Sequence, residues 1–259
     1  MLATSLPLGW RLLIVAASGV AAGVANGIAG GGTFLSFPTL LALGVPSLQA
    51  NVSSTVGIVP SSLGGVRGFR RELRLHHALL KSLVPTCVMG SVAGTAALLV
   101  GSNKSFTSVV PWLIGAATVL FALAPQVTKL LERRRLGDHP LRVRRKTLFI
   151  GVFLASVYGG YFGAGLGIVL LAVMALTLPF EIYEIQGLRS ALAMIINAVA
   201  ALVFVIRGHL DVSAVVVLLV SSFVGGLLGT YLIRRVSPKI VRMLVVLVGL
   251  GTTIKLAIG

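Results

Sequence analysis

Hydrophobic residues run along this chain in long stretches, separated by short polar or turn-prone segments. Splitting the chain at those breaks gives eight apolar segments, near residues 11–43, 50–66, 78–100, 107–127, 147–178, 188–206, 212–233 and 240–258. A helix needs about 20 apolar residues to cross a hydrocarbon core of roughly 30 Å. The pattern therefore predicts an all-α polytopic membrane protein.

A basic, turn-prone stretch separates the first four segments from the last four. It runs from Lys129 to Lys146 and contains six arginines together with Gly137 and Pro140. Such a composition is typical of a linker between apolar units. We therefore expect a first transmembrane repeat over residues 1–128, a basic cytoplasmic linker over 129–146, and a second transmembrane repeat over 147–259.

The two halves match at a nearly constant offset. A shift of 133 residues aligns Gly27 with Gly160, Gly30 with Gly163, Gly32 with Gly165 and Pro46 with Pro179; a shift of 135 aligns Gly90 with Gly225 and Gly94-Thr95 with Gly229-Thr230. Glycines are abundant here and can align by chance, but the order is preserved across separate blocks. The pattern favours an internal duplication.

Segments 11–43 and 147–178 are too long to be single straight spanning helices, because a helix rises only about 1.5 Å per residue. Either their glycines break them into re-entrant hairpins, or each is one tilted and kinked helix. Hairpins would invert the second half and bring the cluster from Arg234 to Arg242 to the same side as the linker. The positive-inside rule favours that inverted arrangement, with both termini outside the cytoplasm.

Composition and charge support a membrane protein. The chain is 56% hydrophobic and 11% charged, and its mean hydropathy is +1.02. The net charge of +16 comes from Lys and Arg that lie between apolar segments, where they orient a membrane protein. We therefore expect no nucleic-acid partner. The single Cys87 cannot form an internal disulfide, and the first apolar run has no charged leader, so we assign it to the mature fold.

Two glycine clusters, Gly30-Gly31-Gly32 and Gly163-Ala164-Gly165-Leu166-Gly167, occupy matching places in the long segments. One interpretation is structural: small residues at four-residue spacing let a neighbouring backbone approach closely. The other is functional: a chain break at membrane depth is tolerated where it is buried in protein or lines a cavity, and the freed amides at helix ends bind anions. Added bulk in either cluster should abolish transport under both interpretations, but only the functional one predicts a protein that stays folded and monodisperse.

A polar start follows each long segment. The first contains Asn51, Ser53, Ser54 and Thr55, and the second contains Gln186, Arg189 and Ser190. Ordinary helix capping explains part of this pattern. The alternative is a hydrogen-bonding pocket for an oxyanion, in which the planar guanidinium of Arg189 binds sulfonate, carboxylate or phosphate oxygens. Snorkelling is the other interpretation of Arg189.

The remaining polar residues leave two alternatives open. Asn197 and Ser61 or Ser62 lie at matched mid-helix positions, which suits interhelical hydrogen bonds first and cavity lining second. Asp211, His76, Glu181 and Glu184 lie at segment ends, as solvated ends or as proton carriers in a coupled cycle. No catalytic constellation or metal-ligand spacing is present, so we expect neither an enzyme nor a cofactor.

The stretch from Gly23 to Pro60, with Asn26, Gly27, the triple glycine and the polar run after Pro46, resembles the sulfite exporter TauE/SafE family, also called TSUP. Gly160–Gly167, Gly90–Thr95 and Gly225–Thr230 are similar to its repeated glycine patterns. The resemblance implies a carrier of the bacterial or archaeal inner membrane for sulfite, sulfoacetate or other sulfonates, with possible proton coupling. The frequent Thr-Ser pair of that family stands here as Ser54-Thr55, and its second-half counterpart is Arg189-Ser190.

The leading hypothesis is a secondary carrier that moves a small sulfur-containing anion by alternating access at the interface of two repeats. In this hypothesis the polar residues of both halves bind the substrate's oxygens, and the glycine backbones complete the site. The main rival is an anion channel or passive facilitator of the same fold, and a membrane enzyme is a distant third. No pattern in the sequence specifies an oligomeric state.

Overall fold

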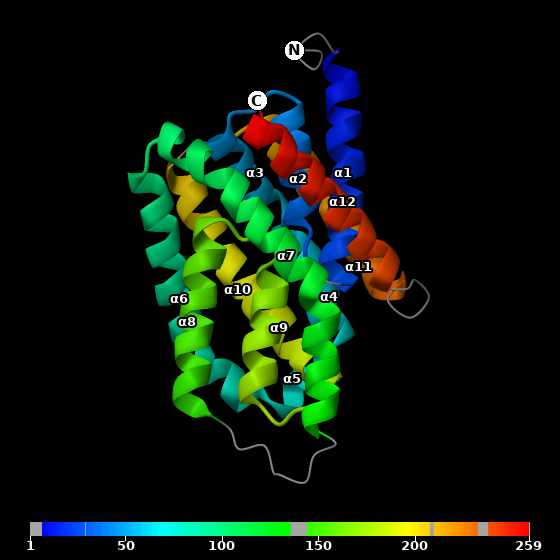
Figure 1. The fold of residues 1–259 in the computed structure, drawn as a ribbon. Coiled ribbons are helices and arrows are strands. Elements are labelled where there is room, and N and C mark those ends of the chain that lie inside the picture. Colours follow the sequence, from blue (N-terminus) through cyan, green and yellow to red (C-terminus); the bar gives the residue numbers. More distant parts are fainter. Residues whose placement is uncertain (1–6, 29, 136–143, 208–209, 233–237, 259) are drawn as a thin grey trace.

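A computed structural model describes residues 7–28, 30–135, 144–207, 210–232 and 238–258, and these residues form helices joined by short turns (Figure 1). Among them the structure contains no β-strand. The all-α fold class predicted from the hydrophobic pattern is therefore confirmed. Residues 136–143 of the linker, and Arg234 and Arg235 of the predicted basic cluster, lie outside the described residues.

The described residues of the first half form seven α-helices and one short 3-10 helix. They are α1 (Leu8–Ile28), α2 (Thr33–Ala42), α3 (Ser47–Ile58), η2 (Val59–Ser61), α4 (Ser62–Gly68), α5 (Arg70–Leu75), α6 (His77–Val100) and α7 (Asn103–Arg135). The apolar segment predicted over 50–66 is thus not one helix. Pro60 lies at the start of η2 and has no backbone N–H, so the α-helical hydrogen bonding changes there.

Five α-helices make up the described part of the second half. They are α8 (Arg145–Tyr161), α9 (Leu166–Thr177), α10 (Ile182–Arg207), α11 (Val212–Leu232) and α12 (Pro238–Ile258). α10 begins before the apolar segment predicted from residue 188, so Arg189 lies two turns inside a helix.

Both long apolar segments are broken at their glycines and fold back as hairpins. The first hairpin, α1–α2, is closed at its ends by Arg11, whose Nη2 donates a hydrogen bond to the carbonyl of Leu43 over 3.2 Å. The second hairpin, α8–α9, is closed by the amide of Arg144, which donates to the carbonyl of Thr177 over 3.1 Å. Each hairpin therefore begins and ends on the same side of the molecule.

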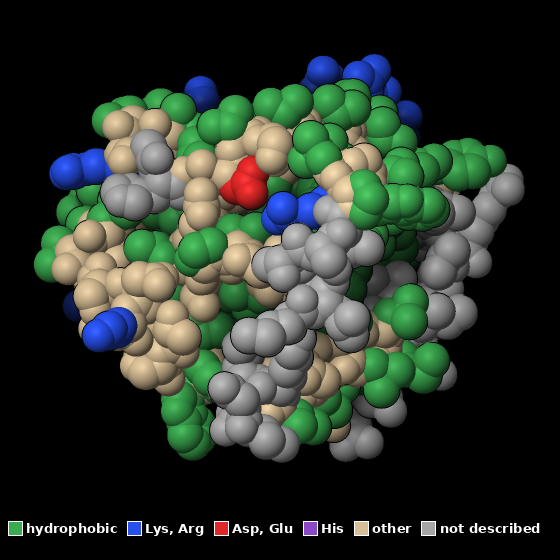
Figure 2. Space-filling view, turned by 90° about the horizontal axis from the view of Figure 1, so that it is seen from above, with side chains coloured by type: hydrophobic (Ala, Val, Ile, Leu, Met, Phe, Trp, Pro, Cys, Tyr) green, Lys and Arg blue, Asp and Glu red, His purple; other side chains and the backbone are tan. Residues whose placement is uncertain are grey.

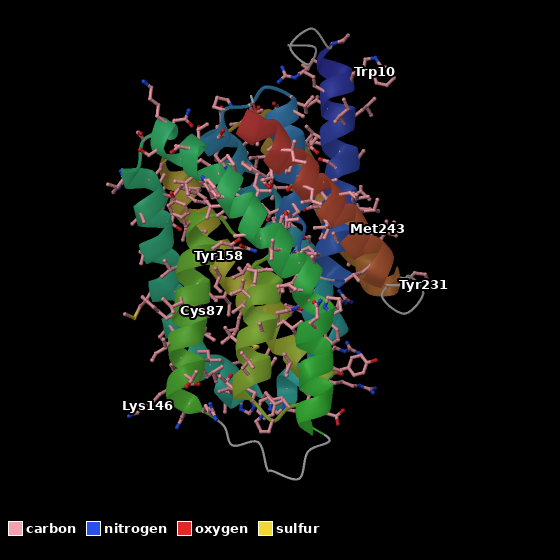
Figure 3. All side chains as sticks on the ribbon, in the orientation of Figure 1. Trp10, Cys87, Lys146, Tyr158, Tyr231 and Met243 are labelled. Carbon is pink, nitrogen blue, oxygen red and sulfur yellow. The ribbon has the colours of Figure 1, made fainter. Side chains whose placement is uncertain are left out.

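The two hairpins enter the fold from opposite ends. Trp10, near the start of α1, lies at the upper end of the view, and Lys146, at the start of α8, lies at the lower end (Figure 3). Both chain termini lie towards the upper part, whereas α7 ends and α8 begins at the lower end (Figure 1). This is the relative orientation expected of inverted halves.

Each hairpin packs against a helix of the other half, and the contacts repeat. A Cβ added at Gly225 of α11 would lie under 3.0 Å from the carbonyl oxygen of Val20 in α1, and one added at Gly90 of α6 would lie equally close to that of Phe153 in α8. These residues are related by the shifts of 135 and 133 seen in the sequence. One turn further on, Gly229 meets Val24 as Gly94 meets Val157. Glycine is needed here because the backbones touch.

The outer surface is apolar, as a lipid-facing surface must be. Where the structure describes the chain, five helices are long and apolar enough to cross a membrane: they cover Leu8–Ile28, His77–Val100, Asn103–Gln126, Ile182–Arg207 and Val212–Gly229. Seen from above, hydrophobic side chains gather around much of the rim (Figure 2). Exposed residues such as Trp112 and Val100 belong to this surface. One buried hydrophobic cluster contains several phenylalanines, among them Phe34, Phe37, Phe121 and Phe162.

Candidate functional site

A small cavity lies where the first and second halves meet, and we call it the junction cavity. The first half contributes residues of α1, the α1–α2 break, η2 and α4, and the second half contributes residues of α9 and α10. Its lining consists of Asn26, Gly27, Gly30, Ser61, Ser62, Gly65, Gly167, Arg189, Ser190 and Ala193. Its volume of about 10 Å³ is close to the minimum needed for one water molecule.

Glycines of the two hairpins touch at this cavity. Gly30 has a φ of +77°, a left-handed conformation that favours glycine. A Cβ there would lie 2.9 Å from the Cα of Gly167 and 2.7 Å from Nη1 of Arg189. A Cβ on Gly167 would lie 2.8 Å from the Cα of Gly30. The break of the first hairpin therefore rests on the start of α9, and both lie beside the same guanidinium.

Arg189 gives the cavity its charge. Among the cations whose side chains the structure describes, Arg189 is the buried one, with 2% of its surface exposed. It is also the one lining residue with a formal charge, so the cavity is positive. An intramembrane arginine that faces a cavity is by default a candidate for binding an anionic substrate.

Hydroxyl and amide groups surround the guanidinium. The Nδ2 of Asn26 donates to Ser61 Oγ at 2.7 Å and to Ser62 Oγ at 3.3 Å. Ser61 in turn donates to the carbonyl of Ile58. Because a serine hydroxyl has one proton and two acceptor positions, Ser62 accepts from Asn26 and keeps its own O–H to donate. Ser62 therefore provides a hydroxyl donor next to the positive charge.

The start of α9 adds a second positive feature. Gly167 lies in the first turn of this twelve-residue helix. The amides of Ile168 and Val169 in this turn donate to the carbonyl of Gly165, and the helix dipole places a partial positive charge at this end. A guanidinium, a hydroxyl donor and a helix N-terminus thus converge on one small space, which is the chemistry that oxyanions prefer.

Comparison with known proteins identifies the family. The sulfite exporter TauE/SafE family model matches residues 15–256. The chain belongs to this family. The resemblance seen in the glycine patterns is thereby confirmed, and the protein is a membrane transporter of the TauE/SafE type.

Curated relatives agree with that assignment. The chain is 23% identical over 248 residues to a Haemophilus influenzae protein named "Probable membrane transporter protein", covering 95% of this chain and 94% of that one. It is 23% identical to the Escherichia coli K12 "Probable membrane transporter protein YfcA", covering 91% and 85%. It is 25% identical to a Sinorhizobium "Probable membrane transporter protein ORF9", covering 91% and 88%. These names describe transporters, in agreement with a protein that is not an enzyme.

Three of the site residues predicted from the sequence of this TauE/SafE protein line the junction cavity: Gly30, Arg189 and Ser190. Ser190 donates to the carbonyl of Gln186, and Gln186 itself does not line the cavity. The other glycines lie nearby with different neighbours. Gly31 lies against Phe121, Gly32 against Ala22, Gly163 near Asn197, and Gly165 near Phe34.

The polar run of α3 lies elsewhere in the interior. Asn51 donates to the carbonyl of Tyr161 over 3.1 Å, Ser53 accepts from the amide of Asp211 over 2.9 Å, and Ser54 shares a hydrogen bond with Ser36. Thr55 is buried and is not among the lining residues. These side chains connect α3 to the second half and to α2.

Seven lining residues were not among the predicted site residues: Asn26, Gly27, Ser61, Ser62, Gly65, Gly167 and Ala193. Ser61 and Ser62 were predicted first as interhelical hydrogen-bonding groups, and they act in both roles. Gly167 carried a signal that could have found it, because it closes the second glycine cluster. Gly65 and Ala193 carried none, since small residues are common throughout this chain.

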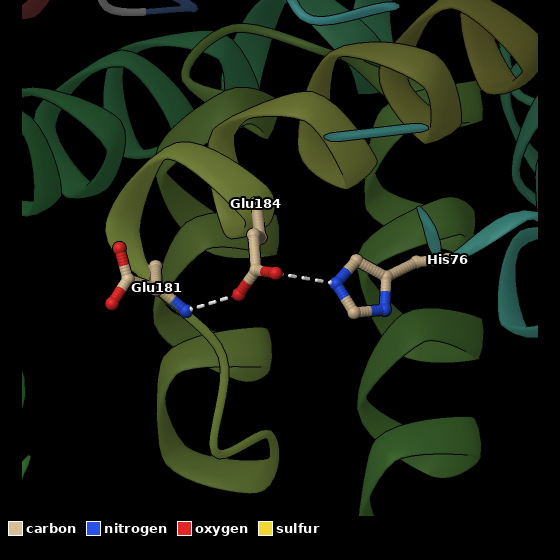
Figure 4. A network of polar contacts seen from close by, with 3 residues as sticks. All are labelled: His76, Glu181 and Glu184. Atoms are coloured by element: carbon tan, nitrogen blue, oxygen red, sulfur yellow. Dashed lines mark hydrogen bonds and ion pairs between the residues drawn. The ribbon is translucent and has the colours of Figure 1, made fainter. Parts of the chain in front are cut away.

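The polar residues at segment ends join helices of opposite halves. Nε2 of His76 lies 2.9 Å from Oε1 of Glu184, and Oε2 of Glu184 accepts the amide of Glu181 over 2.6 Å (Figure 4). Asp211 caps α11 by accepting from the amide of Ala214. Among the described residues, no group of three His, Cys, Asp or Glu side chains is placed to hold a metal ion.

Proposed function

We propose that this TauE/SafE family protein carries a small sulfur-containing anion, such as sulfite, sulfoacetate or another organosulfonate, across the inner membrane by alternating access. The substrate's anionic group would bind in the junction cavity. Arg189 would make paired hydrogen bonds to two oxygens, and Ser62 would donate to another oxygen beside the positive end of the α9 dipole.

One observation carries the proposal. The buried cation of the described structure lies where the chain breaks of the two halves touch. Substrate sites of repeat-built transporters lie at such interfaces, with helix ends aimed at the anionic group. The family supports transport in general, and this geometry supports an anion as the cargo.

The size of the cavity favours a carrier over the rival channel or passive facilitator. A volume of about 10 Å³ cannot hold a sulfonate, so binding requires the walls from the two halves to move apart. Gly30 and Gly167 touch without side chains, so they can separate without disturbing interdigitated side chains. Movement of one half against the other is what alternating access requires.

Ligand binding tests the site. Purified protein is screened by thermal shift against sulfite, sulfate, thiosulfate, sulfoacetate, taurine and simple carboxylates, because a ligand that binds the folded state raises the melting temperature. The selected anion is then titrated against Arg189→Gln and against Arg207→Gln, a matched change at the exposed end of the same helix. We expect Arg189→Gln to weaken binding roughly ten- to a hundredfold, and Arg207→Gln to leave it unchanged. If a folded Arg189→Gln protein kept the wild-type affinity, Arg189 would not be part of the binding site.

Counterflow separates the carrier from the channel. Proteoliposomes loaded with unlabelled substrate should accelerate the uptake of labelled substrate if the protein is a carrier. Equal uptake with and without internal substrate would favour the channel.

A further inference from the structure

A second hollow, much larger than the junction cavity, lies along α4, α5 and the end of α11. Its volume is about 780 Å³, and we call it the basic recess. It is lined by Gly64, Arg67, Gly68, Arg70, Arg71, Glu72, Leu227 and Tyr231. Gly65, the neighbour of Gly64, lines the junction cavity instead, so the two spaces lie on different faces of α4.

The polar wall of the recess is strongly positive. Arg67, Arg70 and Arg71 are all exposed, and Glu72 supplies the one negative side chain. The ion pairs found among the described residues include none to these three arginines. Oε2 of Glu72 is buried without a hydrogen-bond partner, so this carboxylate does not neutralise its neighbours through a direct contact. The recess therefore has a net positive charge.

The opposite wall is apolar and continues into the membrane surface. Leu227 is 43% exposed and Tyr231 is 63% exposed. The same helix exposes Val220, Phe223 and Val224, within a span apolar enough to cross a membrane. Tyrosine is enriched where a spanning helix meets the polar headgroups. The recess thus lies at the boundary between hydrocarbon-facing and water-facing surface.

We propose that the basic recess binds the headgroup of an anionic phospholipid, with the acyl chains lying along the exposed apolar face of α11. Arginine forks bind phosphate oxygens in pairs, and basic hollows beside spanning helices on the cytoplasmic side suit anionic headgroups. α5 lies at the end of the molecule where α7 ends and α8 begins, which the charge pattern predicts to be cytoplasmic (Figure 1). A soluble phosphate compound would satisfy the arginines but would not use Leu227 or Tyr231.

Native mass spectrometry of the purified protein tests this proposal with two probes, dioleoyl phosphatidylglycerol and dioleoyl phosphatidylcholine. We expect the wild type to retain the anionic lipid in preference. The triple variant Arg67→Gln/Arg70→Gln/Arg71→Gln should bind it roughly a hundredfold more weakly, because each basic residue near a membrane surface contributes roughly fivefold. Binding of the zwitterionic lipid should be unchanged.

A matched variant removes three exposed charges elsewhere: Arg74→Gln/Lys81→Gln/Lys104→Gln. It should lose much less affinity for the anionic lipid. Leu227→Gln should weaken the lipid while leaving the binding of glycerol 3-phosphate unchanged. If the first triple variant is not monodisperse, Arg71→Gln alone should show a loss of about fivefold.

Three results would overturn the proposal. The first is equal lipid binding by the wild type and the recess variants, and the second is equal loss in the two triple variants. The third is competition by glycerol 3-phosphate as strong as that by the intact lipid, which would identify a soluble phosphate as the occupant.

Discussion

The two hairpins share one backbone plan and differ in what faces their breaks. At the junction cavity the break of α1–α2 meets Gly167 and Arg189. At the matching place in the other half, the shifts of 133 and 135 residues put Phe34 where Gly167 stands and Ser54 where Arg189 stands. Phe34 is 1% exposed and packs edge-to-face on Phe121 at 5.3 Å between ring centroids. The matching place is therefore filled by an aromatic ring.

Two more positions show the same asymmetry. Ser61 and Gly65 line the junction cavity, and their counterparts are the fully buried Ile196 and Ala200. A duplicated scaffold thus keeps its helix contacts and holds one polar site, because larger apolar residues fill the other. The predictions below test whether charge or filling creates this difference, from the largest expected effect to the smallest.

Phe34→Ala should give the largest loss of stability, about 3–5 kcal/mol, because it removes a fully buried ring. Phe204→Ala, also 1% exposed and outside the matching place, should cost a similar amount. Isothermal titration with the selected anion should still give one site per chain in both variants, because Ser54 carries no charge. A second binding equivalent in Phe34→Ala alone would mean that filling, and not charge, restricts the protein to one site.

Gly30→Ala should have the next largest effect, a loss of stability of about 1–3 kcal/mol. Overpacking and the strain of an alanine in a left-handed backbone conformation both contribute to it. Substrate binding should be lost as well, since the new methyl group would meet Arg189 and Gly167. Gly44→Ala is the control, because Gly44 has a similar φ of +84° in an exposed turn. It should lose about 1 kcal/mol of stability and keep its affinity; a binding loss in both variants would mean that strain acts without the cavity.

Asn51→Ala and Asn26→Ala should separate the interior of α3 from the cavity. Asn51 is fully buried and bonded to the carbonyl of Tyr161, so its loss should cost about 1–3 kcal/mol of stability with little change in affinity. Asn26→Ala should weaken anion binding about fivefold, because it orients Ser61 and Ser62. The opposite assignment of the two effects would return α3 to the binding site.

Glu184→Gln should have the smallest effect on stability, a loss below about 1 kcal/mol. The ion pair that it removes is weak because His76 and Glu184 are both partly exposed. Asp211→Asn is the control. Asp211 aligns with His76 at the shift of 135, and it caps α11, which an asparagine can also do. Melting temperatures at about 0.01 M and about 1 M salt should show a salt-dependent loss for Glu184→Gln alone. Salt dependence in both would indicate a general charge effect.

Much of this fold could be predicted from the sequence. Apolar length predicted the membrane helices, and the glycine clusters marked where the two long segments break, because a chain break needs conformations that Gly30, Gly163 and Gly165 adopt with positive φ. Matched glycines also carried the repeated contacts, since backbone contact leaves no room for a side chain. Pro60 divided a segment that hydropathy alone presented as continuous.

The site was harder to predict, for a physical reason. α3 is buried on every side from Ala50 to Ile58, so its polar residues indicated burial without indicating which neighbour they face. Arg189 was recognisable because a cation inside an apolar helix is costly wherever it points. Gly65 became part of the site through tertiary packing, which no local pattern encodes.

The packing of each hairpin against a helix of the other half has a consequence for how the chain is synthesised and folded. α1 leaves the ribosome before the other described helices, and its packing partner α11 begins only at Val212. At about 5–20 residues per second, the first hairpin waits roughly 10–40 s for the helix that covers its glycine face. α8 meets the opposite situation, because α6 is already present when it emerges. The packing of α1 in the membrane therefore depends on the later synthesis of α11, and a chain released before α11 lacks the surface against which α1 packs.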